Sequence, residues 1–166
     1  MNTTLLGENT ISLFGSFVQN GQKAPDFTLV GQDLKTRSLK DYAGKTVILN
    51  IFPSIDTSTC ATSVRKFNER AASLENVEVI CVSRDLPFAQ KRFCGAEGIE
   101  NVSTLSDFRD GSFGRDYGVE MQDGVLQGLH ARAVVVISPR GEVVYSEMVP
   151  SISSEPDYES ALTAAQ

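Results

Sequence analysis

The longest apolar stretches of the chain predict buried strands. Val47–Phe52 shows no regular alternation of polar and apolar positions and is rich in β-branched side chains. This pattern is typical of a strand covered on both faces, as in a parallel sheet between helix layers. Val77–Val82 and Ala133–Ile137 are predicted as strands by similar apolar runs, and further strands are expected at Phe27–Val30, Val102–Leu105 and Val143–Val149.

A period of three to four residues predicts helices between these strands. One helix face about four turns long is marked by the apolar positions Ala61, Val64, Phe67, Ala71 and Leu74. A second helix is expected from Pro87 to Cys94, with its end at Gly95. A last helix is expected to begin near Ser154, with Pro156 just inside it. Single helical turns are expected within Ser38–Ala43 and Phe108–Tyr117.

The order of these elements predicts the fold class. A strand, a helix and a strand in succession form a βαβ unit, which should cross over right-handed. Thr3–Leu6 and Thr10–Phe14 flank a short turn and predict an N-terminal β-hairpin. We therefore expect a thioredoxin-like α/β fold, with a mixed central sheet, helices on both faces and this hairpin. No repeat or interdomain linker is visible, so residues 1–166 are expected to form a single domain.

Composition limits the classes of partner. The hydrophobic content of 41% and charged content of 22% are ordinary for a globular protein. The net charge of −6 and the scattered basic residues argue against nucleic acid and anionic membranes. The first residues lack the basic and apolar regions of a signal peptide, and no apolar run reaches the roughly 18 residues of a membrane span. These observations predict a cytoplasmic location.

The cysteine and histidine content narrows the chemistry. Three cysteines, Cys60, Cys81 and Cys94, are too few for a secreted disulfide scaffold. With one histidine, His130, and no close cysteine pair, the chain lacks ligands at zinc-site spacing. Cys81 lies inside an apolar strand and is interpreted as a buried structural cysteine. His130 is interpreted as a surface residue beside Arg132.

Candidate chemistry centres on Cys60, which falls in the first turn of the predicted helix after Pro53 stops the strand. A reference thiol has a pKa of about 8.5, so few thiols are ionised at neutral pH. The helix N-terminus contributes only about 0.3–1 kcal/mol toward the thiolate at an exposed site. A nearby cation is therefore needed. Arg65 and Lys66 point away from Cys60 on the helix, so the cation must come from elsewhere in the chain. Arg132 is the best candidate, because it immediately precedes the apolar run of a probable central strand, although an arginine at such a position can also be a surface or ion-paired residue.

The sequence leaves the roles of two further residues open. Thr57 either caps the helix only, or also offers its hydroxyl to the thiolate or a substrate. Cys94, near the end of the second helix, either pairs with Cys60 or is a half-buried cysteine without a role. A disulfide needs Cα atoms within about 7 Å, which a sequence does not show.

Five separated segments resemble the peroxiredoxin family, and within it the bacterial thiol peroxidases, the atypical two-cysteine peroxiredoxins. They are Asn50–Thr57, Cys60–Asn68, Asp85–Gln90, Arg92–Gly98 and Ala131–Ile137. Pro53-x-x-x-Thr57-x-x-Cys60 resembles the family's active-site motif, and the combination of segments is more specific than that motif alone. The pair Ser58-Thr59 is more polar than in many members, which leaves the catalytic set intact.

The resemblance implies a role for each candidate. Cys60 matches the peroxidatic cysteine, which becomes a sulfenic acid, and Cys94 matches the resolving cysteine of the same chain, which converts it to a redox disulfide. Thr57 and Arg132 match the residues that orient the peroxide and stabilise the thiolate and leaving oxygen, and Pro53 matches the residue that shields the site. The family also implies thioredoxin as electron donor, a homodimer, hydrogen peroxide and alkyl hydroperoxides as substrates, and no metal, haem or flavin.

Two other functions remain open from the sequence. One is a general thiol–disulfide oxidoreductase, against which the absence of a Cys-x-x-Cys pair argues. The other is a redox-sensing or holdase module that uses the same disulfide as a switch. If Cys60 and Cys94 pair, both of their helices are expected to unwind in part to bring the sulfur atoms together.

Overall fold

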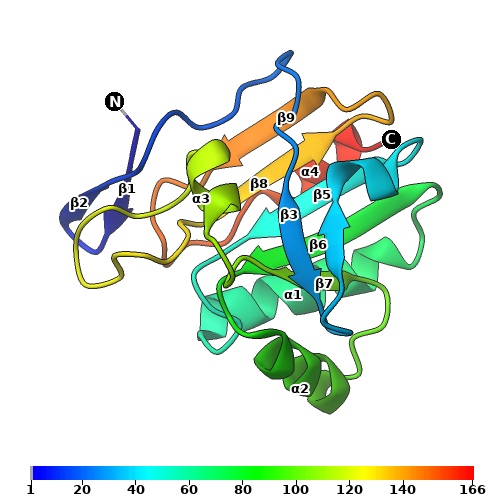
Figure 1. The fold of residues 1–166 in the computed structure, drawn as a ribbon, viewed down its shortest axis with the longest axis horizontal. Helices are drawn as coiled ribbons and strands as arrows, with labels where there is room; N and C mark the ends of the chain where they lie inside the picture. The colour runs from blue at the N-terminus through cyan, green and yellow to red at the C-terminus, as the bar shows by residue number, and fades with distance from the viewer. Residues whose placement is uncertain (1) are drawn as a thin grey trace.

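The computed structural model describes residues 2–166, and a seven-stranded mixed sheet lies at its centre (Figure 1). The strands follow the order β4-β3-β7-β6-β5-β8-β9. β6 pairs in parallel with both β5 and β7, and the other neighbours are antiparallel. The strand bounds are β3 Thr28–Gly31, β4 Thr36–Ser38, β5 Thr46–Ile51, β6 Val77–Ser83, β7 Ser103–Ser106, β8 Ala133–Ile137 and β9 Val143–Met148. The predicted mixed sheet is confirmed.

Strand β5 lies between β6 and β8, and the register fixes which chain ends meet. Ile51, at the end of β5, pairs with Val82 of β6 in parallel and with Ala133 of β8 in antiparallel fashion. The residues that follow β5 and β6, and the residue that precedes β8, therefore meet at one edge of the sheet. We call it the carboxyl edge, because β5, β6 and β7 all end there.

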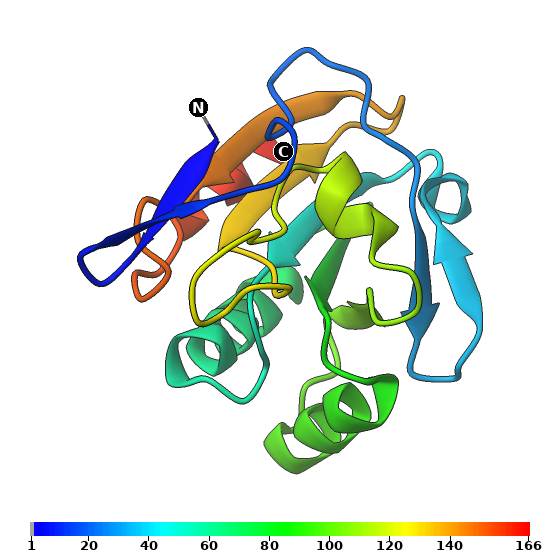
Figure 2. The same ribbon diagram turned by 60° about the vertical axis from the view of Figure 1, so that its left-hand side comes forward.

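Helices cover both faces of the sheet, as predicted (Figure 2). Alternate side chains of a strand point to opposite faces, so Ile48 packs with α1 and α4, whereas Leu49 packs with Phe113 of α3. Helix α2 shares an apolar cluster with the start of α1. The helix bounds are α1 Ser58–Ala71, α2 Pro87–Glu97, α3 Ser112–Asp116 and α4 Tyr158–Ala164, with a 3₁₀ turn η1 at Leu39–Tyr42. Among residues 2–166, none of these helices is long and apolar enough to cross a membrane.

The predicted N-terminal hairpin is confirmed as β1 (Thr3–Leu6) and β2 (Asn9–Ser12). It packs beside the segment after β9, because the Leu5 N–H donates to the Pro150 carbonyl at 3.0 Å and the Ile152 N–H donates to the Leu5 carbonyl at 2.9 Å. The hairpin therefore holds a segment that reaches the carboxyl edge.

Two predicted helix boundaries are wrong, and one short strand is not predicted. Helix α2 continues through Gly95 and ends at Gly98, whose φ of 67° is the left-handed conformation that glycine adopts readily. Helix α4 begins at Tyr158 rather than near Ser154, because the Asp157 carboxylate caps it by accepting the Ser160 N–H at 3.1 Å. The sequence does not predict β4, a three-residue edge strand without a buried side chain.

Candidate active site

Cys60 lies in the first turn of α1, and this helix begins at the carboxyl edge of the sheet (Figure 1). Its side chain is 0% exposed and packs in an apolar cluster with Phe52, Ile55 and Val64. The thiol is free. Since a buried charge is costly unless a partner compensates it, a thiolate here needs a cation within the same enclosure.

Arg132 supplies a cation beside this sulfur atom. Its Nη2 donates to the Cys60 Sγ at 3.3 Å, and its side chain is 1% exposed. The sheet register explains why Arg132 lies near Cys60. Arg132 directly precedes Ala133, and Ala133 pairs with Ile51 at the end of β5. A charge-assisted contact in so dry a site is stronger than the same contact in water.

Hydrogen bonds with backbone groups hold Arg132 in place. Its Nε donates to the Ile152 carbonyl at 2.7 Å, and its own carbonyl accepts the Val149 N–H at 3.0 Å. Ile152 is in turn held by Leu5 of the N-terminal hairpin. The buried Nη1 has no hydrogen-bond partner among residues 2–166. One donor next to the thiol is therefore free for an oxygen of a substrate.

The other two candidate residues, Pro53 and Thr57, lie in the loop between β5 and α1. Pro53 is buried immediately after the strand. Thr57 occupies the N-cap position of α1, but its hydroxyl makes no capping bond and instead donates to the Ser54 carbonyl at 3.1 Å. Thr57 is exposed, so its side chain lies at the outer side of the loop that leads to Cys60.

Asp85, to which the sequence analysis assigns no role, fixes this loop. Its carboxylate accepts the Ser54 hydroxyl at 2.8 Å, the Ile55 N–H at 2.7 Å and the Ser83 hydroxyl at 2.6 Å. The signal in the sequence is its position two residues after the end of β6. Because β5 and β6 are parallel neighbours, the residues that follow them meet at the carboxyl edge.

We expect Asp85→Ala to slow the oxidation of Cys60 by hydrogen peroxide roughly tenfold to a hundredfold, because the loop before Cys60 loses its anchor. Asp85→Asn, which keeps one acceptor oxygen, should recover part of the loss. Stopped-flow oxidation of both variants checks this, with thermal unfolding as the measure of folding. A well-folded Asp85→Ala protein with the unaltered rate would contradict the positioning role.

Cys94 lies in α2 and belongs to the same apolar cluster as Cys60. Burial raises the pKa of the Cys94 thiol, and a hydrogen bond from the Gln32 side chain opposes the shift. The side chain is 7% exposed, the thiol is free, and it lines a hollow of about 370 Å³ between α2 and the β3–β4 segment. In this conformation Cys94 is thus a protonated, covered thiol.

Two ion pairs join α1 and its preceding loop to α2. Arg65 pairs with Glu97 at 2.6 Å, and Arg92 pairs with Asp56 at 2.9 Å. All four side chains are at least one-third exposed, and exposed pairs contribute only about 0–1 kcal/mol each. The pairs therefore hold α2 loosely. As predicted, Arg65 is turned away from Cys60.

Cys81 is fully buried in β6, and burial raises the pKa of its thiol to about 12. The Asn50 side-chain amide donates to its sulfur at 3.7 Å. This environment matches the expected structural cysteine, because a thiol that stays protonated is a poor nucleophile.

The prediction that His130 is a surface residue is wrong. Its side chain is 0% exposed, and its Nε2 lies 2.8 Å from the Asp107 Oδ2. The long connection between β7 and β8 folds over it and brings Glu120 and Arg84 into an adjacent ion pair. Local sequence does not reveal this burial, because the covering residues are distant along the chain.

Arg132→Met should slow the alkylation of Cys60 at neutral pH by roughly tenfold, because it removes the cation that contacts the Cys60 sulfur. Iodoacetamide reaction rates measure this change, in a Cys81→Ser, Cys94→Ser background so that one thiol reacts. Arg65→Met is the matched control and should leave the rate unchanged. An unaltered rate in a folded Arg132→Met protein would deny Arg132 this electrostatic role.

Known proteins share this arrangement of sheet, helices and loop. The sequence matches the Redoxin family over residues 19–162. The thiol peroxidases of Mycobacterium bovis and Mycobacterium tuberculosis are 58% identical over 161 residues, which cover 97% of this chain and 96% of each relative. A peroxiredoxin-like protein from Aquifex aeolicus has a crystal structure that matches with a TM-score of 0.93 and 39% identity, over 99% of this chain and 96% of that one.

The chain therefore belongs to the redoxin family and, within it, to the thiol peroxidases, which are peroxiredoxins. The predicted family and the predicted thioredoxin-like fold are both confirmed.

Residues 2–166 contain no group of three His, Cys, Asp or Glu side chains that could hold a metal ion.

Proposed function

We propose that this chain reduces hydroperoxides by a two-cysteine cycle in which Cys60 is the peroxidatic residue and Cys94 of the same chain is the resolving residue. The Cys60 thiolate attacks the terminal peroxide oxygen, the O–O bond breaks, and an alcohol or water leaves after taking a proton. The resulting sulfenic acid condenses with the Cys94 thiol, which forms the disulfide and releases water. Two electrons from an external dithiol restore both thiols.

The observation that carries the proposal is the 3.3 Å contact between the Arg132 Nη2 and the Cys60 Sγ. The same guanidinium has a buried donor, Nη1, without a partner in the described chain. A group with one donor on the nucleophile and another free can stabilise the thiolate and also the negative charge that develops on the leaving oxygen.

The loop residues would complete the site. We assign Thr57 to orienting the peroxide, since its hydroxyl lies at the outer side of the loop and is bound only to the Ser54 carbonyl. Pro53 would shield the sulfur atom from water, a role that its burial after β5 supports. Because Cys60 itself is 0% exposed, even a small hydroperoxide needs a local opening of this loop.

Disulfide formation would require α2 to move. Cys94 is covered, and its helix is joined to α1 through exposed ion pairs. We expect amide hydrogen exchange in the first turn of α1 and the second half of α2 to be at least tenfold faster in the disulfide form than in the dithiol form. Exchange followed by mass spectrometry checks this, and equal protection in both forms would contradict the unwinding.

Thioredoxin is the electron donor we propose, and a homodimer is the assembly. Leu86, Phe88 and Phe108 support a protein-binding surface at the carboxyl edge, because these large apolar side chains are 51%, 66% and 39% exposed. Exposed apolar groups gathered near a reactive site are typical of interaction surfaces. A cytoplasmic location would keep the donor reduced.

Steady-state assays with thioredoxin, thioredoxin reductase and NADPH test the proposal. We expect turnover with hydrogen peroxide and with cumene hydroperoxide, which is an organic hydroperoxide. Disulfide exchange without peroxide turnover would instead favour a general oxidoreductase. Peroxide-driven disulfide formation with partner binding but negligible turnover would favour a redox sensor or holdase.

A further inference from the structure

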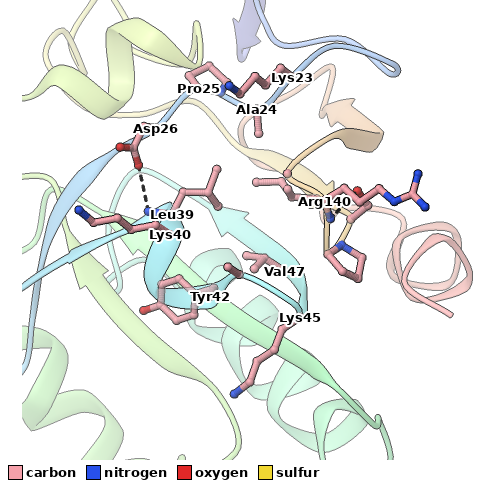
Figure 3. Close-up of a pocket in the computed structure, with 15 residues that line it drawn as sticks. Lys23, Ala24, Pro25, Asp26, Leu39, Lys40, Tyr42, Lys45, Val47 and Arg140 are labelled. Carbon is pink, nitrogen blue, oxygen red and sulfur yellow. Dashed lines mark hydrogen bonds between the residues drawn. The ribbon is translucent and has the colours of Figure 1, made fainter.

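A second hollow lies at the end of the sheet opposite Cys60, where β5 begins and β8 ends (Figure 3). Its volume is about 550 Å³, within the range typical of small-molecule sites. Cys60 follows the far end of β5, roughly 15–20 Å away at the usual rise of a strand. The hollow is therefore separate from the peroxide site.

Three segments form the hollow, and backbone hydrogen bonds join them. The Ala24 N–H donates to the Gly141 carbonyl at 2.8 Å, which ties the segment before β3 to the turn between β8 and β9. The Gly44 N–H donates to the Pro139 carbonyl at 3.3 Å, which ties the end of η1 to the same turn. The walls are thus connected to one another without a ligand.

The floor of the hollow is apolar. Val47 and Ile137 pair across β5 and β8, and both belong to the main core cluster. Leu39 and Tyr42 of η1 pack against that cluster and form the side of the hollow. Figure 3 shows the Leu39 and Val47 side chains among the residues that line the hollow. An apolar body of a ligand would lose contact with water here.

The rim carries positive charge, although the chain as a whole carries −6. Lys40, Lys45 and Arg140 stand on different sides of the hollow, with Lys23 above it, and the charged ends of the first three point outward in this conformation (Figure 3). Only Lys45 has an ion-pair partner among the described residues, at 4.0 Å. The carboxylate of Asp26, the one acidic residue of the lining, accepts the Phe27 and Leu39 N–H groups at 2.9 and 3.1 Å.

We propose that this hollow binds a small amphipathic anion, with an apolar body over the floor formed by Leu39, Val47 and Ile137 and an acidic head group at the basic rim. The chemistry that fits is a medium-chain carboxylate. The apolar floor favours a hydrocarbon chain, and three cations without an ion-pair partner favour a negative head group. The site is independent of the peroxidase cycle.

Isothermal titration with decanoate, below its micelle-forming concentration, tests the proposal on the full chain. We expect saturable one-to-one binding, with amide NMR shifts at residues 23–26, 39–47 and 137–141. Decanol, which lacks the charge, should bind at least tenfold more weakly. Absence of saturation, shifts centred elsewhere, a change to a larger assembly, or equal affinity for decanol would overturn the proposal.

Charge reversal at the rim gives a matched comparison. The variant with Lys40→Glu and Arg140→Glu should bind decanoate about tenfold more weakly, because two attractive charges become repulsive. The control carries Lys35→Glu and Lys91→Glu, the same change in net charge at exposed positions outside the hollow. Its affinity should stay within about twofold of the parent chain, and an equal loss in both variants would contradict a site at this hollow.

Discussion

Cys60→Ser is expected to abolish peroxide turnover, with a loss on the order of a thousandfold or more. A serine hydroxyl beside Arg132 does not become an anionic nucleophile at neutral pH, and no other described cysteine has a cation in hydrogen-bond contact. The thioredoxin-coupled assay and direct consumption of hydrogen peroxide should fail together. The substitution is nearly isosteric, so the variant should fold.

Cys81→Ser is the control for this loss, since Cys81 is buried in β6. That variant should keep at least half of the turnover of the parent chain. Peroxide consumption by a folded Cys60→Ser protein at the parent rate would remove Cys60 from its proposed role. A large kinetic loss in a folded Cys81→Ser protein would contradict its structural assignment.

Cys94→Ser is expected to separate the two halves of the cycle. The first oxidation should proceed at nearly the parent rate, because Arg132 and the loop before Cys60 are untouched. Thioredoxin-coupled turnover should fall to background, because the Cys60 sulfenic acid lacks the thiol with which it condenses. With excess peroxide this sulfenic acid should advance to sulfinic acid.

Quenched-flow mass spectrometry measures the first oxidation, and dimedone labelling detected by mass spectrometry identifies the sulfenic acid. Excess peroxide should add two oxygen atoms to Cys60 of the Cys94→Ser protein, whereas the parent chain resists this change. Full thioredoxin-coupled turnover by Cys94→Ser would show that Cys94 is not the resolving residue.

The strands other than β4, and the first helix, are predictable because short-range patterns determine them. Val47–Phe52 and Ala133–Ile137 have strong β-branched runs, and α1 has a clear apolar face. Arg132 is predictable as the candidate cation because it directly precedes the apolar run of a probable central strand. The register of β5 with β8 is the physical basis of that contact.

The missed features depend on contacts between distant residues. Two of the three hydrogen bonds of Asp85 reach a loop about 30 positions earlier in the chain, and no local pattern marks them. His130 is buried by the long β7–β8 connection, which has little regular structure of its own. The end of α2 was misplaced because Gly95 is tolerated inside a helix, at a cost of about 1 kcal/mol, while Gly98 terminates it.

The most direct test of the two-cysteine mechanism is disulfide mapping after one equivalent of hydrogen peroxide. Trypsin cleavage after Arg65, Arg84 and Arg92 places the three cysteines on separate peptides. We predict a linked pair that contains Cys60 and Cys94, with both halves from one chain when ¹⁴N- and ¹⁵N-labelled proteins are mixed. Mixed-isotope pairs, or oxidised Cys60 with a free Cys94 thiol, would contradict an intramolecular resolving step.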